Sequence, residues 1–207
     1  EARRLPTLFR QKATRARLNI AIMPDLSRRR LAGLLQRVQG VLPELDLTLS
    51  DYGTPADCRL TLDALRREDE IFLPLWEEDY VLCVRTDHPL ASRARIALTE
   101  LQHYDFIECP PCEAHQQTIG LLACDRLTLN LVAKAESKGL VMALVLAGVG
   151  ISFLPDGLVE DEPGLRTVAV SGPRMFRRIG LCYPAHQTLN PALRDLIPEL
   201  ASRGASW

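Results

Sequence analysis

Residues 137–155, SKGLVMALVLAGVGISFLP, decide the fold class of this chain. Ser137 is a typical residue to cap a helix start, and Gly148 is typical just beyond a helix end, so a helix is predicted over Gly139–Ala147. The apolar run Ile151–Pro155 then predicts a strand buried on both faces. A helix followed by a buried strand is the repeating unit of an α/β protein.

The same alternation of strands and helices extends to both sides of this stretch. Toward the C-terminus, Pro191 stands at a favourable first position for an amphipathic helix that carries Leu193, Leu196 and Leu200. The other elements predicted for this half are the strand Tyr104–Glu108, a helix over about Glu113–Cys124, and the strands Leu127–Ala135, Leu165–Val170 and Ile179–Tyr183.

The first half of the chain shows the same pattern. Leu18–Met23 alternates like a strand, Ser27 can cap a helix that runs through Val38, and Leu45–Leu49 alternates again. This order predicts a right-handed βαβ unit with parallel strands. Further strands are predicted over Cys58–Asp63, Ile71–Trp76 and Tyr80–Val84.

The composition is that of an ordinary globular protein, with 47% hydrophobic and 25% charged residues in a chain of 207. The longest apolar run, Leu140–Leu154, is shorter than the roughly 20 residues that span a bilayer. Six cysteines are too few for a disulfide scaffold at this length. The first residues show no apolar core after their basic residues, as a secretory signal would, so a cytoplasmic protein is expected. Residues 1–17 are predicted to be the end of a linker helix, and their basic charge favours either nearby nucleic acid or a solvated surface.

Two longer strings carry a family resemblance. PLWEEDYVLCV (residues 74–84), followed by DHPLA (residues 87–91), resembles the segment that leads from the first lobe to the second in LysR-type bacterial transcription regulators. Residues 137–155 resemble the helix, Gly-x-Gly turn and strand of the same family. Together with the opening strand, the resemblance to the effector-binding domain of these regulators covers nearly all of residues 18–200.

This resemblance implies an α/β fold of two Rossmann-like lobes, periplasmic-binding-protein-like of type 2, joined by crossover hinge strands. The hinge strands would cross near Val81–Asp87 and return near Leu181–Tyr183. Residues 18–84 would form the first part of lobe I, residues 85–182 lobe II, and residues 183–207 the return to lobe I with a C-terminal helix. The chain departs from the family in one place, because residues 50–73 leave little room for the helix and strand that the family usually has there.

The resemblance also implies partners. A small-molecule effector would bind between the lobes, and the chain would form a homodimer or homotetramer. Promoter DNA would be bound by a winged helix-turn-helix preceding residue 1, with RNA polymerase as an indirect partner. No membrane, metal or cofactor is expected. The alternative of the same fold is a free solute-binding protein.

Three predicted helix starts converge on the expected crevice and supply candidate effector-binding residues. Exposed N–H groups and the helix dipole favour an anion at such a start, so an anionic effector is expected. A capping role would also explain the serines, and both roles stay open. The candidates are Asp25, Leu26 and Ser27 at the first start, Cys109, Pro111, Cys112 and Glu113 at the second, and Ser137, Lys138 and Gly139 at the third.

The second helix start carries the motif CPPC at residues 109–112, directly after a strand. Four roles are open for these cysteines: pocket lining around an organic effector, a redox-responsive thiol, inert packing, or a metal site. Some LysR-type regulators that sense peroxide carry their reactive cysteine in this turn, so the resemblance makes Cys112 the redox candidate, with Cys124 or Cys109 as its partner. Zinc bound with His115 is disfavoured, because His115 and Cys124 would lie about two and a half helical turns apart.

Enzymatic alternatives have less support. A thiol-disulfide oxidoreductase would also place CPPC between a strand and a helix, but here the motif follows a complete βαβ unit in mid-chain. The serines lack a Gly-x-Ser-x-Gly elbow, and the turn Gly148-Val149-Gly150 has a helix before it and a strand after it, the reverse of a dinucleotide loop. No catalytic residue is therefore predicted.

Overall fold

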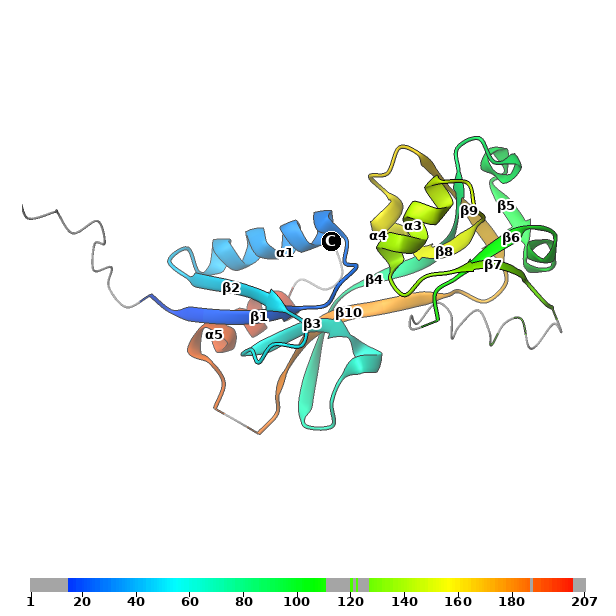
Figure 1. The fold of residues 1–207 in the computed structure, drawn as a ribbon. Coiled ribbons are helices and arrows are strands. Elements are labelled where there is room, and N and C mark those ends of the chain that lie inside the picture. Colours follow the sequence, from blue (N-terminus) through cyan, green and yellow to red (C-terminus); the bar gives the residue numbers. More distant parts are fainter. Residues whose placement is uncertain (1–14, 111–119, 121, 123–126, 187, 203–207) are drawn as a thin grey trace, which may run out of the picture.

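Two long antiparallel strands, β4 (Glu70–Arg85) and β10 (Phe176–Pro184), join the two lobes of the molecule (Figure 1). The structure is a computed structural model that describes residues 15–110, 120, 122, 127–186 and 188–202. β4 pairs with β10 from Glu70 to Asp79, and its second half pairs with strands of the other lobe. The hinge is therefore continuous sheet and not a flexible linker.

Lobe I is built on a βαβ unit, as predicted. Its elements are β1 (Arg17–Ile22), α1 (Arg28–Val41), β2 (Asp46–Asp51), β3 (Cys58–Leu62), the 3-10 turn η1 (Asp63–Leu65) and the final helix α5 (Pro191–Ala201). β1 and β2 pair in parallel with Leu18 opposite Leu47, and β3 pairs in parallel with the other side of β1. The hydroxyl of Ser27 caps α1 by accepting from the N–H of Arg30.

Lobe II has a second α/β arrangement around the far half of β4. Its elements are η2 (Pro89–Ser92), β5 (Arg95–Ala97), η3 (Leu98–His103), β6 (Asp105–Glu108), β7 (Asn130–Lys134), α3 (Lys138–Leu146), β8 (Ser152–Pro155), α4 (Asp156–Val159) and β9 (Leu165–Ser171). One sheet of eight strands runs through both lobes in the order β2-β1-β3-β10-β4-β9-β5, with β8 also beside β4. The helix and strand predicted from residues 137–155 are α3 and β8.

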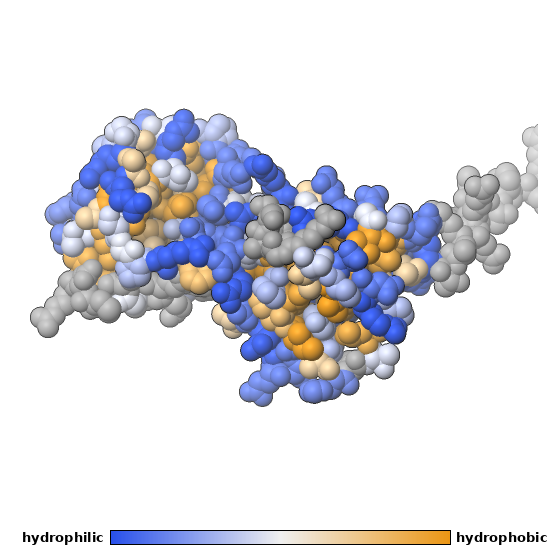
Figure 2. All heavy atoms as spheres, turned by 180° about the vertical axis from the view of Figure 1, so that it is seen from behind, coloured by the Kyte–Doolittle hydropathy of each residue, from blue (hydrophilic) through white to orange (hydrophobic). Residues whose placement is uncertain are grey.

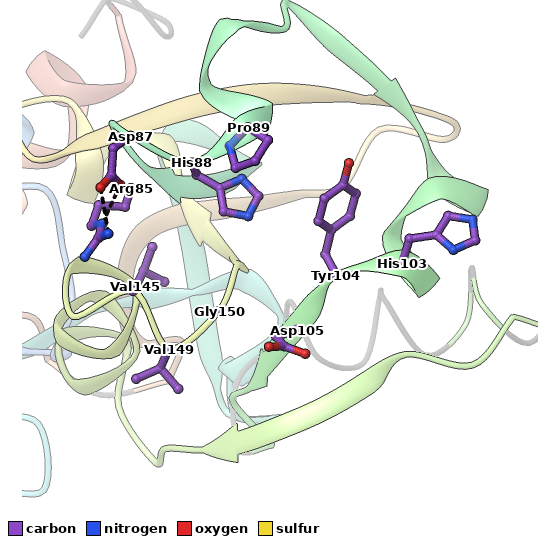
Figure 3. Close-up of a pocket in the computed structure, with 11 residues that line it drawn as sticks. Arg85, Asp87, His88, Pro89, His103, Tyr104, Asp105, Val145, Val149 and Gly150 are labelled. Atoms are coloured by element: carbon purple, nitrogen blue, oxygen red, sulfur yellow. Dashed lines mark hydrogen bonds and ion pairs between the residues drawn. The ribbon is translucent and has the colours of Figure 1, made fainter.

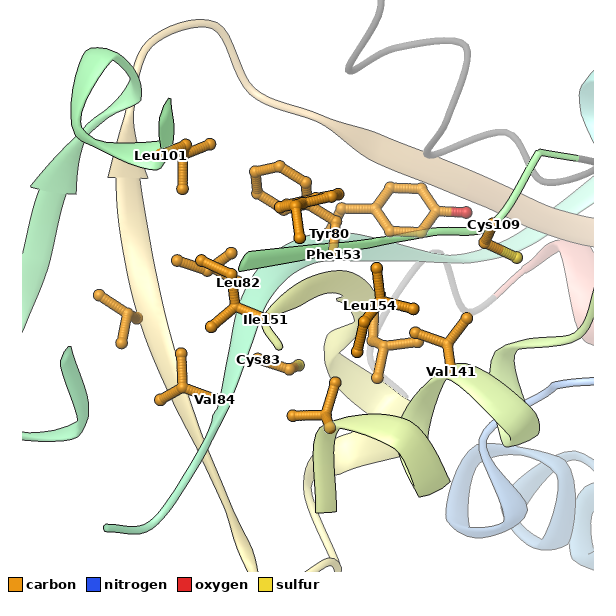
Figure 4. Packing of buried hydrophobic residues seen from close by; sticks show 14 of the residues in the cluster. Tyr80, Leu82, Cys83, Val84, Leu101, Cys109, Val141, Ile151, Phe153 and Leu154 are labelled. Atoms are coloured by element: carbon orange, nitrogen blue, oxygen red, sulfur yellow. The ribbon is translucent and has the colours of Figure 1, made fainter. Parts of the chain in front are cut away.

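Each lobe has its own hydrophobic core. In lobe II, Leu82 of β4 packs in one cluster with Val141 of α3 and Leu154 of β8 (Figure 4). β4 passes from one core to the other between Trp76 and Tyr80. These residues precede the boundary drawn at residue 84 from the sequence, and that domain division stays a prediction. The core of lobe I unites the sheet with both helices through Leu18, Leu34, Leu60, Leu181, Leu193 and Leu196.

The strands predicted over residues 71–76 and 80–84 are parts of one strand. The expected break is absent because residues 77–79 continue to pair with β10. Pro74 is accommodated opposite Gly180, beside a register shift between Ile179 and Gly180 where the ladder is irregular. Such an irregularity is where a sheet tolerates a residue without an N–H donor.

Other predicted boundaries are also corrected or left open. The strand predicted over residues 127–135 is confined to β7, and Arg17, placed in the linker, begins β1. Residues 1–14 of the predicted linker helix lie outside the described residues. So does most of the helix predicted over residues 113–124, of which Gly120 and Leu122 are described and helical.

The connection between β2 and β3 is much shorter than a helical crossover. Residues 52–57 are all described, and they form turns and bends with no helix. This short path suffices because β3 begins beside Ile20, with Cys58 opposite it, so the chain has only to step across β1. Parallel strands usually need a connection of a dozen or more residues.

Polar side chains occupy the sheet face that a crossover helix would cover. β2 and β3 lie on the two sides of β1. A right-handed crossover helix from β2 to β3 would therefore lie on the sheet face opposite α1. Arg59 and Thr61 point to that face, because Leu60 between them belongs to the core with α1. The hydroxyl of Tyr52, in the short connection, contacts Arg59 at 2.6 Å and Thr61 at 2.8 Å. Arg59 also pairs with Glu70, so this face is covered without a helix.

Gly180 is expected to be essential to the hinge. A Cβ at this position would lie 2.2 Å from the carbonyl oxygen of Leu73, which belongs to the partner strand and cannot move aside alone. We predict that Gly180→Ala destabilises the chain by about 2 kcal/mol or more in urea unfolding. Gly40→Ala, in α1 with open space around it, is the control and is expected to stabilise by up to about 1 kcal/mol. Equal stability of the two variants would contradict the tight crossing.

Candidate functional site

The start of α3 in lobe II meets the end of β1 in lobe I. Asp25 follows β1, and its Oδ2 accepts a hydrogen bond of 3.1 Å from the backbone N–H of Lys138, 113 positions away in the chain. The hydroxyl of Ser137 accepts from the N–H of Leu140 at 3.3 Å. One carboxylate and one hydroxyl thus cap α3, and the first and third of the predicted helix starts are brought together.

Asp25 has an uncommon backbone conformation. Its φ of +61° lies in the left-handed region, which a residue other than glycine enters at a cost of roughly 1–2 kcal/mol. Asparagine and aspartate tolerate this region better than most residues. The carbonyl oxygen of Asp25 accepts a 2.7 Å hydrogen bond from Nη2 of Arg177, which holds the turn in place.

Arg177 belongs to a buried ion pair at the crossing of the hinge strands. It stands opposite Glu78 across β10 and β4, and its Nη2 lies 2.5 Å from Glu78 Oε2. The two side chains are 1% and 0% exposed. Nε1 of Trp76 donates to the other carboxylate oxygen at 3.1 Å. Since an unpaired charge at this depth would be very costly, the pair fixes both strands and the Asp25 turn together.

A second set of contacts joins α1 of lobe I to α4 of lobe II. Nη2 of Arg30 lies 3.5 Å from Asp156 Oδ1, and Nη1 of Arg29 lies 2.5 Å from Glu160 Oε1. Burial raises the pKa of Asp156, and the charge of Arg30 partly offsets this. Gly157 permits the close approach, because a Cβ there would lie 2.7 Å from the Cβ of Ser27.

The other candidate residues differ in their burial and surroundings. Ser27 is 1% exposed and serves as a helix cap, and Leu26 beside it is also buried. Gly139 is exposed, with open space around its Cα. Cys109 lies in the core of lobe II (Figure 4). The candidates Pro111, Cys112, Glu113 and Cys124 lie outside the described residues. The ligand-binding roles of all of these stay predictions.

Three other cysteines are buried and poorly ionisable. Burial raises the pKa of Cys58 and of Cys83 to about 12, and that of Cys182 to about 11. The thiolate is the reactive form of cysteine, so these three are expected to be inert near neutral pH.

A cavity of about 350 Å³ lies within lobe II, away from the lobe boundary (Figure 3). The guanidinium of Arg85 holds the carboxylate of Asp87 by two hydrogen bonds, of 2.5 and 2.6 Å. Nδ1 of His88 accepts from the N–H of Leu90, and burial lowers the pKa of this histidine. Gly148, with φ of +75°, leaves room for the Arg85 guanidinium. These polar groups already serve the local turns of lobe II.

Two further observations concern metal sites and membranes. Within the part of the chain that the structure describes, no three His, Cys, Asp or Glu side chains are grouped so that they could hold a metal ion. None of the described helices has the length and apolar character needed to cross a lipid bilayer.

Comparison with known proteins assigns the family. Residues 11–205 match the family described as LysR substrate binding domain. The chain belongs to this family. The two-lobed, periplasmic-binding-protein-like fold of type 2 that was predicted is therefore confirmed, and so is the identification as a LysR-type effector-binding domain.

Relatives of this LysR domain are named as transcriptional regulators. It is 32% identical over 132 residues to the uncharacterized HTH-type transcriptional regulator YybE of Bacillus subtilis, covering 63% of this chain and 45% of YybE. It is 25% identical over 203 residues to the DNA-binding transcriptional dual regulator OxyR of Escherichia coli, covering 90% of this chain and 66% of OxyR. The chain spans about half the length of the first curated relatives, between 45% and 59%.

A solved structure has the same fold. The CcmR regulatory domain of Synechocystis PCC6803, solved in complex with 2-PG, superposes with a TM-score of 0.76 at 18% identity. The match covers 90% of this LysR domain and 96% of the CcmR domain.

Sequence reasoning missed the residues that close the lobe boundary. Arg30, Glu78, Asp156 and Arg177 were not among the candidates, although they form its buried and half-buried ion pairs. A signal was available for the hinge pair, because an acidic run at residues 77–79 and a basic pair at residues 177–178 lie in segments that become neighbouring strands.

The hinge pair is expected to behave as a unit. Arg177→Met removes the main partner of the buried Glu78 carboxylate, whose remaining cationic partner is Arg30 Nη1 at 3.7 Å, and should cost about 3 kcal/mol. Glu78→Met together with Arg177→Met should cost much less. Urea unfolding of the wild type, both single variants and the double variant measures the coupling. The exposed pair Arg174–Asp79 is the control, since its removal should cost under about 1 kcal/mol. Additive effects of the two buried substitutions would contradict the assignment.

Proposed function

We propose that this LysR substrate-binding domain senses a small, anionic effector between its two lobes and is the regulatory part of a longer DNA-binding transcription regulator. The meeting of the α3 start with the Asp25 turn carries the proposal, because it places an anion-binding helix start at a boundary between two bodies. A ligand at this boundary contacts both lobes and can shift their relative position. The chain has no catalytic role in this account.

The ligands of structural neighbours support a small organic effector. The CcmR regulatory domain was solved with 2-PG and the effector-binding domain of QuiR with shikimate, which is a carboxylic acid. Lys138 follows the cap residue Ser137 and adds a positive charge to the same helix start. We propose Asp25, Ser137, Lys138 and Gly139 as the residues that such a ligand would touch, with Lys138 itself 6% exposed.

The effector signal would pass through an oligomer to DNA. We propose that promoter DNA is bound by a winged helix-turn-helix ahead of residue 1, with RNA polymerase as an indirect partner, in the cytoplasm. In this scheme the domain division stays as predicted from the sequence, with lobe II inserted between the two parts of lobe I. A change at the lobe boundary would alter how the effector-binding domains of neighbouring copies pack, and hence the spacing of their winged helix-turn-helix domains.

A thermal-shift screen of organic acids, including shikimate, is expected to find at least one that stabilises the chain. An acid at 100 times its Kd should add about 2.7 kcal/mol to the free energy of unfolding. Ser137→Ala and Lys138→Ala should each reduce that gain. Lys134→Ala, which removes the same charge from the exposed strand β7, is the matched control and should leave it unchanged. Undiminished stabilisation in both site variants would place the ligand elsewhere.

The outer face of α3 supports a homo-oligomer. The helix is apolar on all sides, yet Leu140 is 58% exposed, and Leu131 of β7 is 53% exposed. A helix that is hydrophobic all round is normally buried, and further apolar surface is visible on both lobes (Figure 2). We propose that a second copy of this chain covers the α3 face.

Sedimentation is expected to show a dimer or larger assembly of the wild-type chain. Leu140→Glu should dissociate it, because a charge would be buried without a partner at the interface. Leu65→Glu, at a leucine that is 47% exposed in lobe I, is the control and should leave the assembly intact. A monomeric wild type at micromolar concentration, or an assembly insensitive to Leu140→Glu, would remove this part of the proposal.

Peroxide sensing is a second candidate function, favoured by relatives named as hydrogen peroxide-inducible genes activators. We predict that brief, mild peroxide oxidises Cys112 first, to a sulfenic acid or to a disulfide with Cys109 or Cys124, and that a reductant reverses it. Cys58 and Cys83, with pKa values of about 12, are internal controls that should stay reduced. Mass spectrometry of the six cysteines reads the result, and slow, uniform oxidation of all of them would end this candidate.

A further inference from the structure

The turn Gly148-Val149-Gly150 after α3 forms one wall of the lobe II cavity (Figure 3). Both glycines permit close approaches. A Cβ at Gly148 would lie 2.8 Å from Nη1 of Arg85, and a Cβ at Gly150 would lie 2.6 Å from the backbone oxygen of Asp105. Val149 between them is 37% exposed and also lines the cavity. The turn thus brings a guanidinium, a valine and the chain at Asp105 around one space.

The cavity carries one negative charge that no cation of its lining balances. Besides two histidines, its charged lining residues are Arg85, Asp87 and Asp105. Arg85 and Asp87 neutralise one another through two hydrogen bonds, of 2.5 and 2.6 Å. Oδ1 of Asp105 accepts from Nδ2 of Asn130 at 2.6 Å, and no cation among the described residues pairs with this carboxylate. Its Oδ2 is therefore left to accept from a ligand.

The rings of His88 and Tyr104 form an aromatic side of the cavity. Their centroids lie 5.5 Å apart, and their planes are tilted by 57°. Nδ1 of His88 accepts from the N–H of Leu90 at 3.1 Å, so the proton of the neutral ring is on Nε2. Burial lowers the pKa of His88, which favours the neutral ring at neutral pH. A neutral ring does not repel a cation, and the face of Tyr104 attracts one.

We propose that the cavity is a second ligand site for a small organic cation, an alkylammonium ion. The ammonium group donates to Oδ2 of Asp105, and the carbon chain packs on Val149 and on the rings of His88 and Tyr104. A cavity of about 350 Å³ has room for such a ligand. An anion of the same size would be repelled by Asp105.

This site differs from the proposed effector site in charge and in place. Every residue that lines it lies between positions 85 and 150, within lobe II, so a ligand there touches one lobe only. Binding of an alkylammonium ion is therefore expected to leave the lobe boundary unchanged and to be independent of an organic acid bound there. The proposal does not rest on the anionic effector.

An NMR titration of the full 207-residue chain with n-butylammonium chloride tests the site. The backbone amide signals of Gly148 and Gly150 should shift and saturate, with a Kd in the millimolar range because the Asp105 side chain is exposed. n-Butanol has the same carbon chain without the charge, and sodium butyrate has the opposite charge. Neither should shift these two signals at equal concentration and ionic strength.

Three variants separate the contributions to binding. Asp105→Asn removes the charge and keeps an oxygen for Asn130, so the Kd for n-butylammonium should rise about fivefold or more. Asp161→Asn is the matched control, because Asp161 is an exposed carboxylate of lobe II outside the cavity, and it should leave the Kd unchanged. Val149→Ala shortens the apolar wall and should weaken n-butylammonium more than methylammonium.

Three results would overturn the proposal. The first is that n-butylammonium leaves the Gly148 and Gly150 signals in place, and the second is an equal response to n-butanol. The third is the same Kd in Asp105→Asn as in the wild type, because the ammonium group would then not bind this carboxylate. The spectrum of each variant without ligand shows whether its fold is kept.

Discussion

The buried ion pair of Arg177 and Glu78 is the constraint on which the arrangement of the two lobes depends. Both side chains are almost fully buried, on the two strands that cross between the lobes. A charge at this depth is stable only with its partner in place, so the register of β10 against β4 is tightly specified. Through the carbonyl oxygen of Asp25, the same guanidinium sets the turn that reaches α3.

Much of the fold could be predicted because the local patterns agree with the tertiary structure. The helix and strand in residues 137–155 formed as expected, since a cap, a glycine stop and an apolar run all favour the same result. The single strand β4 could not be read from the sequence. Pro74 and the charges at residues 77–79 suggest a break, and only pairing with β10 makes the segment continuous.

The β2–β3 connection is shorter than a helical crossover, and the residues around it fit that short path. The sequence shows that the segment between β2 and β3 is too short for a helix and a further strand. It does not show that β3 begins beside Ile20 of β1, so that no crossover helix is needed. The polar residues Arg59 and Thr61 fit this solution, because a helix-covered face would have carried apolar side chains. The hydroxyl of Tyr52, in the short connection itself, forms hydrogen bonds with both Arg59 and Thr61.

The meeting of two helix starts was predicted from the sequence, but their contacts were not, and their effector-binding role stays a prediction. Helix starts after parallel strands converge at one edge by topology, which brings residues 25–27 toward residues 137–139. The pairing of Asp25 with the N–H of Lys138 depends on the left-handed backbone of Asp25 and on the guanidinium of Arg177, which is 152 positions away in the chain. Neither has a local sequence signal.

The central claim, that an effector binds where the two lobes meet, is tested most directly by a crystal structure with a stabilising organic acid. The account predicts density for the acid beside the start of α3, in contact with residues of both lobes. Density confined to the Arg85 cavity of lobe II would contradict it.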